Sequence, residues 1–150
     1  MQSHPANNQK AFKRDQRALY VLRDGFLDEQ KRKDLHRLIP ADSPVETTRL
    51  IESQIRNGEA WLYDVFEDGE PIGFTVYTFV EGDGKELLSI ASYAKGRGDV
   101  TAEVMPLLEG IAKSNNCKSI RLHTMRTGLV QKLIKADWFV SEIVMRKEIS

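Results

Sequence analysis

The sequence has one cysteine, three histidines and no long run of apolar residues. Cys117 has no second cysteine to pair with, and so few histidines give no basis for a Cys/His metal site, so we expect no bound metal. We expect Cys117 to be a small packed residue. No apolar run approaches the roughly 18 residues of a membrane helix, and the N-terminus is polar. We therefore expect neither a membrane span nor a secretory signal, and a reducing, cytoplasmic location.

The chain also has no excess of charge of either sign, since Lys plus Arg and Asp plus Glu both number 22. No net field attracts the protein to nucleic acid or to an acidic membrane, so we expect neither as a partner. A length of 150 residues favours one domain. Residues 1–16 are polar and positively charged, with Phe12 as their one large apolar side chain. We interpret them as an N-terminal extension to a single domain of residues 17–150.

The apolar residues change their spacing several times along the chain, which predicts a mixed α+β order. A first strand is followed by two helices, three antiparallel strands, and then helix, strand, helix and strand. The predicted strands are 18–23, 60–67, 71–80, 87–93, 119–125 and 139–149, and the predicted helices are 28–38, 43–57, 101–114 and 127–136.

The strongest turn signal is Asp68-Gly69, which separates two segments of period-two apolar alternation and predicts a β-hairpin. A register set by that alternation puts one apolar set from each arm on a buried face. The sets are Trp61, Tyr63 and Val65 in the first arm and Ile72, Phe74 and Val76 in the second.

The main chemical signal is a glycine-rich loop, Lys95-Gly96-Arg97-Gly98, between a predicted strand and a predicted helix. Such a loop aims free backbone N–H groups and the positive end of a helix dipole at one point, which suits a phosphate. Pro106 is awkward within this helix because it removes an intrahelical hydrogen bond. We therefore expect the helix to begin later than residue 101 or to kink.

The order of elements resembles the GCN5-related N-acetyltransferase (GNAT) fold. Residues 66–74 look like that family's second and third strands, joined by a hairpin that leads into an apolar-Gly-apolar step. Residues 95–100 lie where the family has its pyrophosphate loop, Gln/Arg-x-x-Gly-x-Gly/Ala, and residues 133–139 lie where it has its last helix and the aromatic residue after it. The resemblance implies a mixed central sheet, with antiparallel N-terminal strands and a parallel pair around the loop, flanked by about four helices.

The resemblance also implies acetyl-CoA as co-substrate and transfer of its acetyl group to an amine of a small molecule or a protein. Gly98 matches the loop glycine, whereas Lys95 stands where Gln or Arg is usual and Val100 stands at the Gly/Ala position. The main chain of the preceding strand would pair with the pantetheine arm, and the loop and helix start would hold the pyrophosphate. The implied binding residues are Ser92, Tyr93, Ala94, Lys95, Gly96, Arg97, Gly98 and Thr101.

Acyl transfer to an amine needs a base to deprotonate the amine and an acid to protonate the departing thiolate. Glu86, at the start of the strand that leads into the loop, and His123 are the candidate bases. The tyrosine that the family often uses as the acid is replaced by Ile134, so Tyr93 is the candidate acid. A strand-end charge and a structural histidine are the alternative interpretations of Glu86 and His123.

A second hypothesis is a catalytically inactive protein of the same fold that acts through protein contacts. Residues 125–135 resemble small acetyltransferase-like proteins of bacteriophages, some of them internal virion proteins with a decayed cofactor loop. Asp99 and Val100 in the loop fit this alternative, under which the protein would reside in a phage particle. The acceptor and the oligomeric state stay open.

Overall fold

The computed structural model describes residues 18–38, 45–124 and 126–150, so the predicted extension 1–16 and the predicted helix start at Ser43 lie outside the described residues. The order of elements agrees with the prediction from the first strand to the last helix. The strands are β1 (Tyr20–Asp24), β2 (Ala60–Glu67), β3 (Glu70–Glu81), β4 (Lys85–Ala94) and β5 (Ser119–Leu122), and the helices are α2 (Glu29–Leu38), α3 (Val45–Arg56), α4 (Val100–Ser114) and α5 (Thr127–Lys135).

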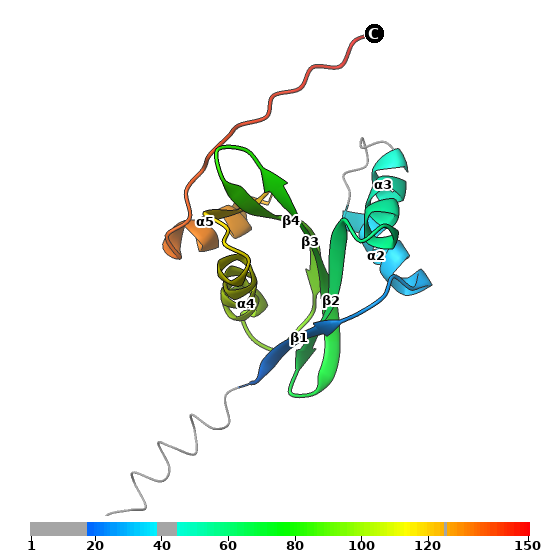
Figure 1. Cartoon of the computed structure of the whole chain (residues 1–150), viewed down its shortest axis with the longest axis vertical. Helices are drawn as coiled ribbons and strands as arrows, with labels where there is room; N and C mark the ends of the chain where they lie inside the picture. The colour runs from blue at the N-terminus through cyan, green and yellow to red at the C-terminus, as the bar shows by residue number, and fades with distance from the viewer. Residues whose placement is uncertain (1–17, 39–44, 125) are drawn as a thin grey trace, which may run out of the picture.

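The five strands form one sheet in the order β1-β2-β3-β4-β5. The first three pairings are antiparallel, and β4 pairs with β5 in parallel. A parallel pair needs a crossover connection, which α4 supplies. Helices α2 and α3 cover one face of the sheet, while α4 and α5 lie on the other (Figure 1). The predicted mixed sheet with its parallel pair is confirmed. None of the described helices has the length and apolar character needed to cross a bilayer.

The β2–β3 hairpin turns at Asp68 and Gly69, whose φ angles of 50° and 83° are those of a tight hairpin turn. A β-bulge follows, because Phe66 pairs with Pro71 whereas Val65 pairs with Gly73, which leaves Ile72 as an extra residue in β3. The bulge shifts the register by one residue, and a shift of one residue reverses the faces of a strand.

The bulge corrects the predicted arrangement of apolar residues in the hairpin. Trp61 lies opposite Tyr77, and Leu62 lies opposite Val76. The predicted sets therefore do not share one face: Phe74 and Val76 belong to a core with α2 and α3, whereas Tyr63, Val65 and Ile72 pack on the side of α4. The first core contains Leu35, Ile51, Ala60, Leu62, Phe74 and Val76, and the second contains Tyr77, Leu87, Leu108 and Ala112.

Helix α4 runs from Val100 to Ser114 with Pro106 inside it, so the expectation of a later start is wrong. The carboxylate of Asp99 caps the helix, accepting a 3.2 Å hydrogen bond from the backbone N–H of Ala102. The predicted strand 119–125 is shorter, because β5 ends at Leu122. His123 consequently lies beyond the strand, and Met125 lies outside the described residues.

The predicted strand 139–149 is not formed, and the segment after α5 runs away from the sheet (Figure 1). Asp137 has a φ of 68°, and the backbone N–H of Trp138 donates to the carbonyl of Leu133 at 2.9 Å. This turn directs the chain outward, and the alternating segment pairs with no described strand, although Glu142 Oε1 lies 3.9 Å from Arg121 Nη1 in β5. Its large apolar side chains are exposed: Phe139, Val140, Ile143, Val144, Met145 and Ile149.

Candidate functional site

Strands β4 and β5 diverge halfway along β4. Their parallel pairing runs only from Glu86 with Ser119 to Ser89 with Leu122, although β4 continues to Ala94. At the point of divergence, Val76 pairs with Ala91 and Tyr77 with Ser89, which leaves a bulged residue between them on β4. Beyond it, β4 pairs with β3 alone. Within the described residues, the other edge of β4 from residue 90 to residue 94 therefore has no strand partner.

The end of β4 is held tightly against β3 where the apolar-Gly-apolar step was predicted. A Cβ atom on Gly73 would lie 1.9 Å from the carbonyl oxygen of Tyr93 and 2.4 Å from the Cα of Ala94. The backbone N–H of Lys95 donates to the carbonyl of Ile72 at 2.9 Å. Glycine is required at this position because any side chain would force the two strands apart. These contacts fix where the glycine-rich loop begins.

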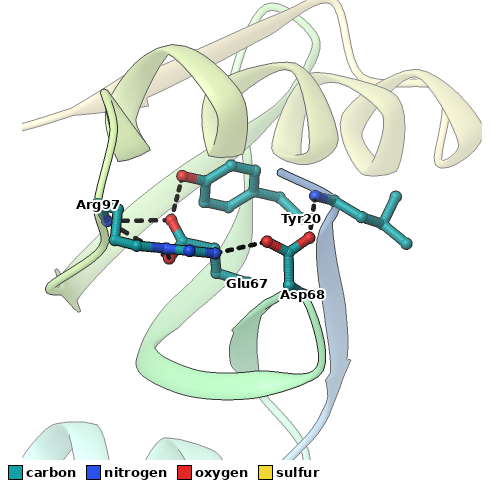
Figure 2. Close-up of polar contacts among 5 residues, drawn as sticks. Tyr20, Glu67, Asp68 and Arg97 are labelled. Atoms are coloured by element: carbon teal, nitrogen blue, oxygen red, sulfur yellow. Dashed lines mark hydrogen bonds and ion pairs between the residues drawn. The ribbon is translucent and has the colours of Figure 1, made fainter. Parts of the chain in front are cut away.

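Inside the loop lies the carboxylate of Glu67, from the end of β2, which is only 4% exposed (Figure 2). It accepts hydrogen bonds from the hydroxyl of Tyr20, from the backbone N–H of Arg97 at 3.1 Å and from Arg97 Nε at 3.1 Å. Asp68 accepts from Arg97 Nη2 at 2.6 Å and from the backbone N–H of Leu19 at 2.8 Å. The two acids thus tie the loop to β1 and to the hairpin turn.

These contacts change the acidities of the groups involved. The hydrogen bond to Glu67, together with burial, raises the pKa of Tyr20 to about 12. The pKa of Glu67 is lowered, first by the hydrogen bond from Tyr20 and then by Arg97. The pKa of Arg97 is raised by its hydrogen bond and charge interaction with Glu67. All three shifts favour the state in which Glu67 and Arg97 are charged and Tyr20 is neutral.

The predicted phosphate cradle is only partly open. The backbone N–H groups of Lys95 and Arg97 already bond within the protein, whereas in the described part of the chain those of Gly96 and Gly98 have no acceptor. At the start of α4, the Asp99 carboxylate takes the N–H of Ala102 and also contacts the ammonium of a lysine in α5. These contacts lower the pKa of Asp99, the hydrogen bond from Ala102 most of all.

The glycines of the loop meet different surroundings. A Cβ atom on Gly96 would lie 2.6 Å from Val100 Cγ2 and 2.7 Å from Glu67 Oε2, so this position has no room for a side chain. A Cβ atom on Gly98 would meet only the Tyr20 hydroxyl, at 3.6 Å. Val100 packs inward against the small core of Tyr20, Val65 and Val104, and so it fills space behind the loop.

Glu86, a candidate base, is engaged with β5. Its carboxylate accepts from Ser119 Oγ at 2.7 Å and contacts Arg121 Nε at 3.3 Å. Ala94 lies eight positions further along β4, which at about 3.3 Å per residue amounts to roughly 26 Å. Glu86 also lines a hollow of about 380 Å³ next to the β3–β4 turn.

The two other candidates lie elsewhere. The Tyr93 ring packs against Phe74, with centroids 6.5 Å apart, and the guanidinium of Arg37 lies 5.6 Å from its centroid. It therefore faces α2, on the opposite side of the sheet from α4. His123 is exposed and directly follows Leu122, where β4 and β5 diverge. The structure does not bring the three candidates together, and their catalytic roles stay predictions.

The remaining predicted binding residues follow one another along the end of β4, the loop and the first turn of α4. Ser92 and Ala94 belong to the part of β4 that pairs with β3 alone, and the Ser92 hydroxyl lies 2.7 Å from Thr75 Oγ1. The ammonium of Lys95 has no acidic partner among the described residues, in contrast with the guanidinium of Arg97. Thr101 lies in the first turn of α4.

Sequence reasoning missed Tyr20, Glu67 and Asp68 as parts of this site. The two acids precede Gly69, where a turn accounts for polar residues without any further role. The one signal in the sequence for a role of Glu67 was its position, because it places a charge at the end of an apolar strand. Nothing along the chain relates it to Arg97, which follows 30 residues later.

No protein-family model matches the sequence, and a search of curated protein sequences finds no match. Solved structures are similar in fold. A transcriptional regulator from Bacillus halodurans C-125 has a TM-score of 0.63 at 14% identity, covering 87% of this chain and 100% of that chain. A predicted acetyltransferase with acetyl-CoA from Clostridium acetobutylicum has a TM-score of 0.58 at 16% identity, covering 87% and 96%.

Glucosamine-6-phosphate N-acetyltransferase from Arabidopsis thaliana has a TM-score of 0.56 at 17% identity, covering 88% of this chain and 99% of that chain. At such identities, the likeness concerns the arrangement of helices and strands. That arrangement includes the mixed sheet and the parallel β4–β5 pair around the loop. The chain therefore has the fold of the GCN5-related N-acetyltransferases.

Proposed function

We propose that this chain is a cytoplasmic N-acetyltransferase that binds acetyl-CoA along the open edge of β4 and acetylates an amine of a small molecule or a protein. The observation that carries the proposal is the divergence of β4 and β5 after Ser89 and Leu122. It leaves the backbone of residues 90–94 available to the amide groups of an extended ligand. The same edge leads into the glycine-rich loop and the start of α4.

The groups at the end of this edge suit a pyrophosphate. The N–H groups of Gly96 and Gly98 have no acceptor within the described residues, and the Lys95 ammonium has no acidic partner there. The first turn of α4, which includes Thr101, adds the positive end of a helix dipole. The negative charge of the Asp99 carboxylate repels a bound anion, but the ammonium of Lys132 partly neutralises this carboxylate.

Bound there, acetyl-CoA would supply its acetyl group as a thioester, whose C–S bond is replaced by a C–N bond while the amine loses a proton and the thiolate gains one. His123 is our first candidate for the base, because it follows β5 at the divergence point. Glu86 is the alternative. Tyr93 contributes its main chain to the open edge, and its role as the acid requires its hydroxyl to reach the sulfur from the α2 side.

A thermal-shift titration tests the binding step. A ligand at 100 times its Kd stabilises the native state by about 2.7 kcal/mol, which amounts to roughly 5–10 °C in Tm for a domain of this size. We expect acetyl-CoA to give such a shift and Gly98→Phe to abolish it, because a bulky side chain would take up space in the loop at a position where its Cβ atom meets only the Tyr20 hydroxyl, at 3.6 Å. Gly110→Phe, an equally open position later in α4, is the matched control.

Turnover is measured separately, as thiol released from acetyl-CoA in the presence of a panel of primary amines. Release that depends on the amine and is lost in Gly98→Phe supports the proposal. No thermal shift at millimolar acetyl-CoA contradicts it.

The second candidate is a non-catalytic protein of the same fold that acts through protein contacts. The observation that favours it is the Glu67 carboxylate, which takes the N–H and the guanidinium of Arg97. An anion supplied by the chain itself thus occupies part of the loop that would otherwise serve a phosphate. This candidate predicts a chain whose Tm is unchanged by acetyl-CoA even in Glu67→Gln.

A further inference from the structure

Two carboxylates hold the guanidinium of Arg97, and they differ in burial (Figure 2). Arg97 Nε donates to Glu67, whose side chain is only 4% exposed, whereas Nη2 donates to Asp68, whose side chain is 43% exposed. The bond to Asp68 measures 2.6 Å and the bond to Glu67 measures 3.1 Å. A ligand that arrives from solution therefore meets the bond to Asp68, while the carboxylate of Glu67 is buried.

The charges of these three side chains do not balance. One guanidinium serves two carboxylates, so the group has a net charge of −1 and repels an anion. Arginine suits a phosphate because its planar fork donates parallel N–H bonds to two oxygens. The Asp68 carboxylate takes the Nη2 side of that fork, which is the side that is not buried against Glu67.

The turn itself does not need the charge of Asp68. Asp68 has a φ of 50°, and Asn-Gly favours such a turn as Asp-Gly does. One carboxylate oxygen, Oδ1, accepts from the backbone N–H of Leu19 at 2.8 Å, and the other, Oδ2, accepts from Arg97. An asparagine would keep the turn and the bond to Leu19 and would lose only the bond to Arg97. The charge of Asp68 therefore serves its contact with Arg97.

We propose that Asp68 is a built-in competitor for the diphosphate of the ligand, because it holds Arg97 Nη2 against the hairpin turn and so sets the affinity of the loop. The inference rests on the proposed function. A diphosphate gains the outer side of the Arg97 fork only by displacing the Asp68 carboxylate. Glu67 keeps the backbone N–H and Nε of Arg97 throughout, so the guanidinium stays beside the loop and only Nη2 changes its acceptor.

The competition also acts on the product. Coenzyme A keeps its diphosphate after the acetyl group has been transferred, so the product meets the same contacts as the co-substrate. Closely related complexes differ mainly in their dissociation rates. Asp68, by taking Arg97 Nη2 back, would therefore speed the release of coenzyme A.

Isothermal titration calorimetry with two probes, inorganic pyrophosphate and coenzyme A, tests the competition. Asp68→Asn frees one charge-assisted donor, so the Kd of each probe should fall about tenfold. In stopped-flow displacement, coenzyme A should leave Asp68→Asn about tenfold more slowly than it leaves the natural chain. The matched control Glu70→Gln removes an exposed acid beside the same turn. Its Kd should stay within about twofold of the natural value at 0.15 M salt, which screens exposed charges.

A double-mutant cycle shows whether Asp68 acts through Arg97. The gain from Asp68→Asn should disappear in an Arg97→Ala background, because the freed donor is then absent. Melting curves without ligand show that each variant is folded. A gain of the same size in the absence of Arg97 would mean a general effect of charge and would overturn the inference.

The remaining outcomes separate the inference from the proposed function. If the natural chain binds the probes and Asp68→Asn binds them no more tightly, the inference alone is overturned. If neither protein binds either probe at millimolar concentration, the proposed function is overturned and the inference with it. Binding by Asp68→Asn but not by the natural chain would support the competition and contradict the use of acetyl-CoA by the natural chain.

Discussion

The backbone N–H of Arg97 donates a 3.1 Å hydrogen bond to the buried carboxylate of Glu67, and the Arg97 side chain donates a second one to the same group. The loop that leads into α4 is therefore built around an acid of the chain itself (Figure 2). Arg97 gives this acid a guanidinium as well as a backbone donor, and charge-assisted bonds are the stronger kind. The loop should depend on the charge of Glu67 more than on its shape.

Glu67→Gln should therefore lower the Tm at neutral pH. The pKa of Glu67 is lowered in the folded protein, so its stabilising effect is present above its ordinary value of 4.5 and is lost as the pH falls through the folded value. The Tm difference between the two proteins should shrink below pH 4.5, measured by circular dichroism from pH 7 to pH 3. Glu70→Gln, at an exposed position beside the same turn, is the control and should change the Tm little. A Tm difference that is independent of pH would contradict a stabilising role for the charged Glu67 carboxylate.

Tyr20 should titrate at about pH 12, well above its ordinary value of 10. Its raised pKa means that the stabilisation is complete below pH 10 and is lost as the pH rises through the folded value. Difference titration of tyrosinate absorbance between the natural chain and Tyr20→Phe isolates this group from the other tyrosines. The same difference measured in a Glu67→Gln background should move back toward 10, because the hydrogen bond to Glu67 is the largest cause of the shift. An unchanged value in that background would mean that burial alone causes it.

Gly73→Val should destabilise the fold by about 3 kcal/mol or more, since neither strand can retreat without breaking the pairing of β3 with β4. The added Cβ atom would lie 1.9 Å from the carbonyl oxygen of Tyr93. Urea denaturation gives the free energy of unfolding. Gly82→Ala, where a Cβ atom has open space, should stay within about 0.5 kcal/mol of the natural chain. Equal stabilities for the two variants would contradict the close approach at Gly73.

Lys95→Ala should weaken acetyl-CoA binding more than Arg97→Ala does. The Arg97 guanidinium is already neutralised by Glu67 and Asp68, whereas the Lys95 ammonium has no acidic partner within the described residues. A lost charge-assisted bond costs about 1.5–3 kcal/mol, so we expect a Kd about tenfold higher or more for Lys95→Ala. Isothermal titration calorimetry measures both variants, with Lys33→Ala on α2 as a control at a distant exposed lysine. A larger loss of acetyl-CoA affinity in Arg97→Ala than in Lys95→Ala would place the phosphates against Arg97.

Local signals in the sequence were sufficient for much of the fold. Asp68-Gly69 specified its turn because both residues take positive φ, and Gly58, with φ 73°, likewise follows the end of α3. The bulge at Ile72 could not be predicted, because an extra residue in a strand is defined by its partner strand. For that reason the two apolar sets of the hairpin were assigned to a common face, although Phe74 and Val76 lie on the opposite face from Val65 and Ile72.

The C-terminal segment shows another limit of the sequence. Its alternation of apolar and polar residues predicted a strand that the structure does not form, because a strand also needs a neighbour to pair with. The left-handed turn at Asp137 is carried by an aspartate, which gives no sign of it in the sequence. In the candidate site, the loop and its glycines were predicted, whereas the acids that fill part of it come from a distant turn.

The contacts of Glu67 have a consequence for the order in which the chain acquires its structure. Its partners lie 47 residues before it, at Tyr20, and 30 residues after it, at Arg97. On a ribosome, the residues of the hairpin that carries Glu67 are synthesised before Arg97. The two acids at the turn are then without their cation, and hairpin closure alone cannot complete the loop. The hydrogen bonds between Glu67 and Arg97 can form only after residue 97 has been synthesised. Contacts between residues so far apart in sequence also form slowly, so the loop takes its final structure late.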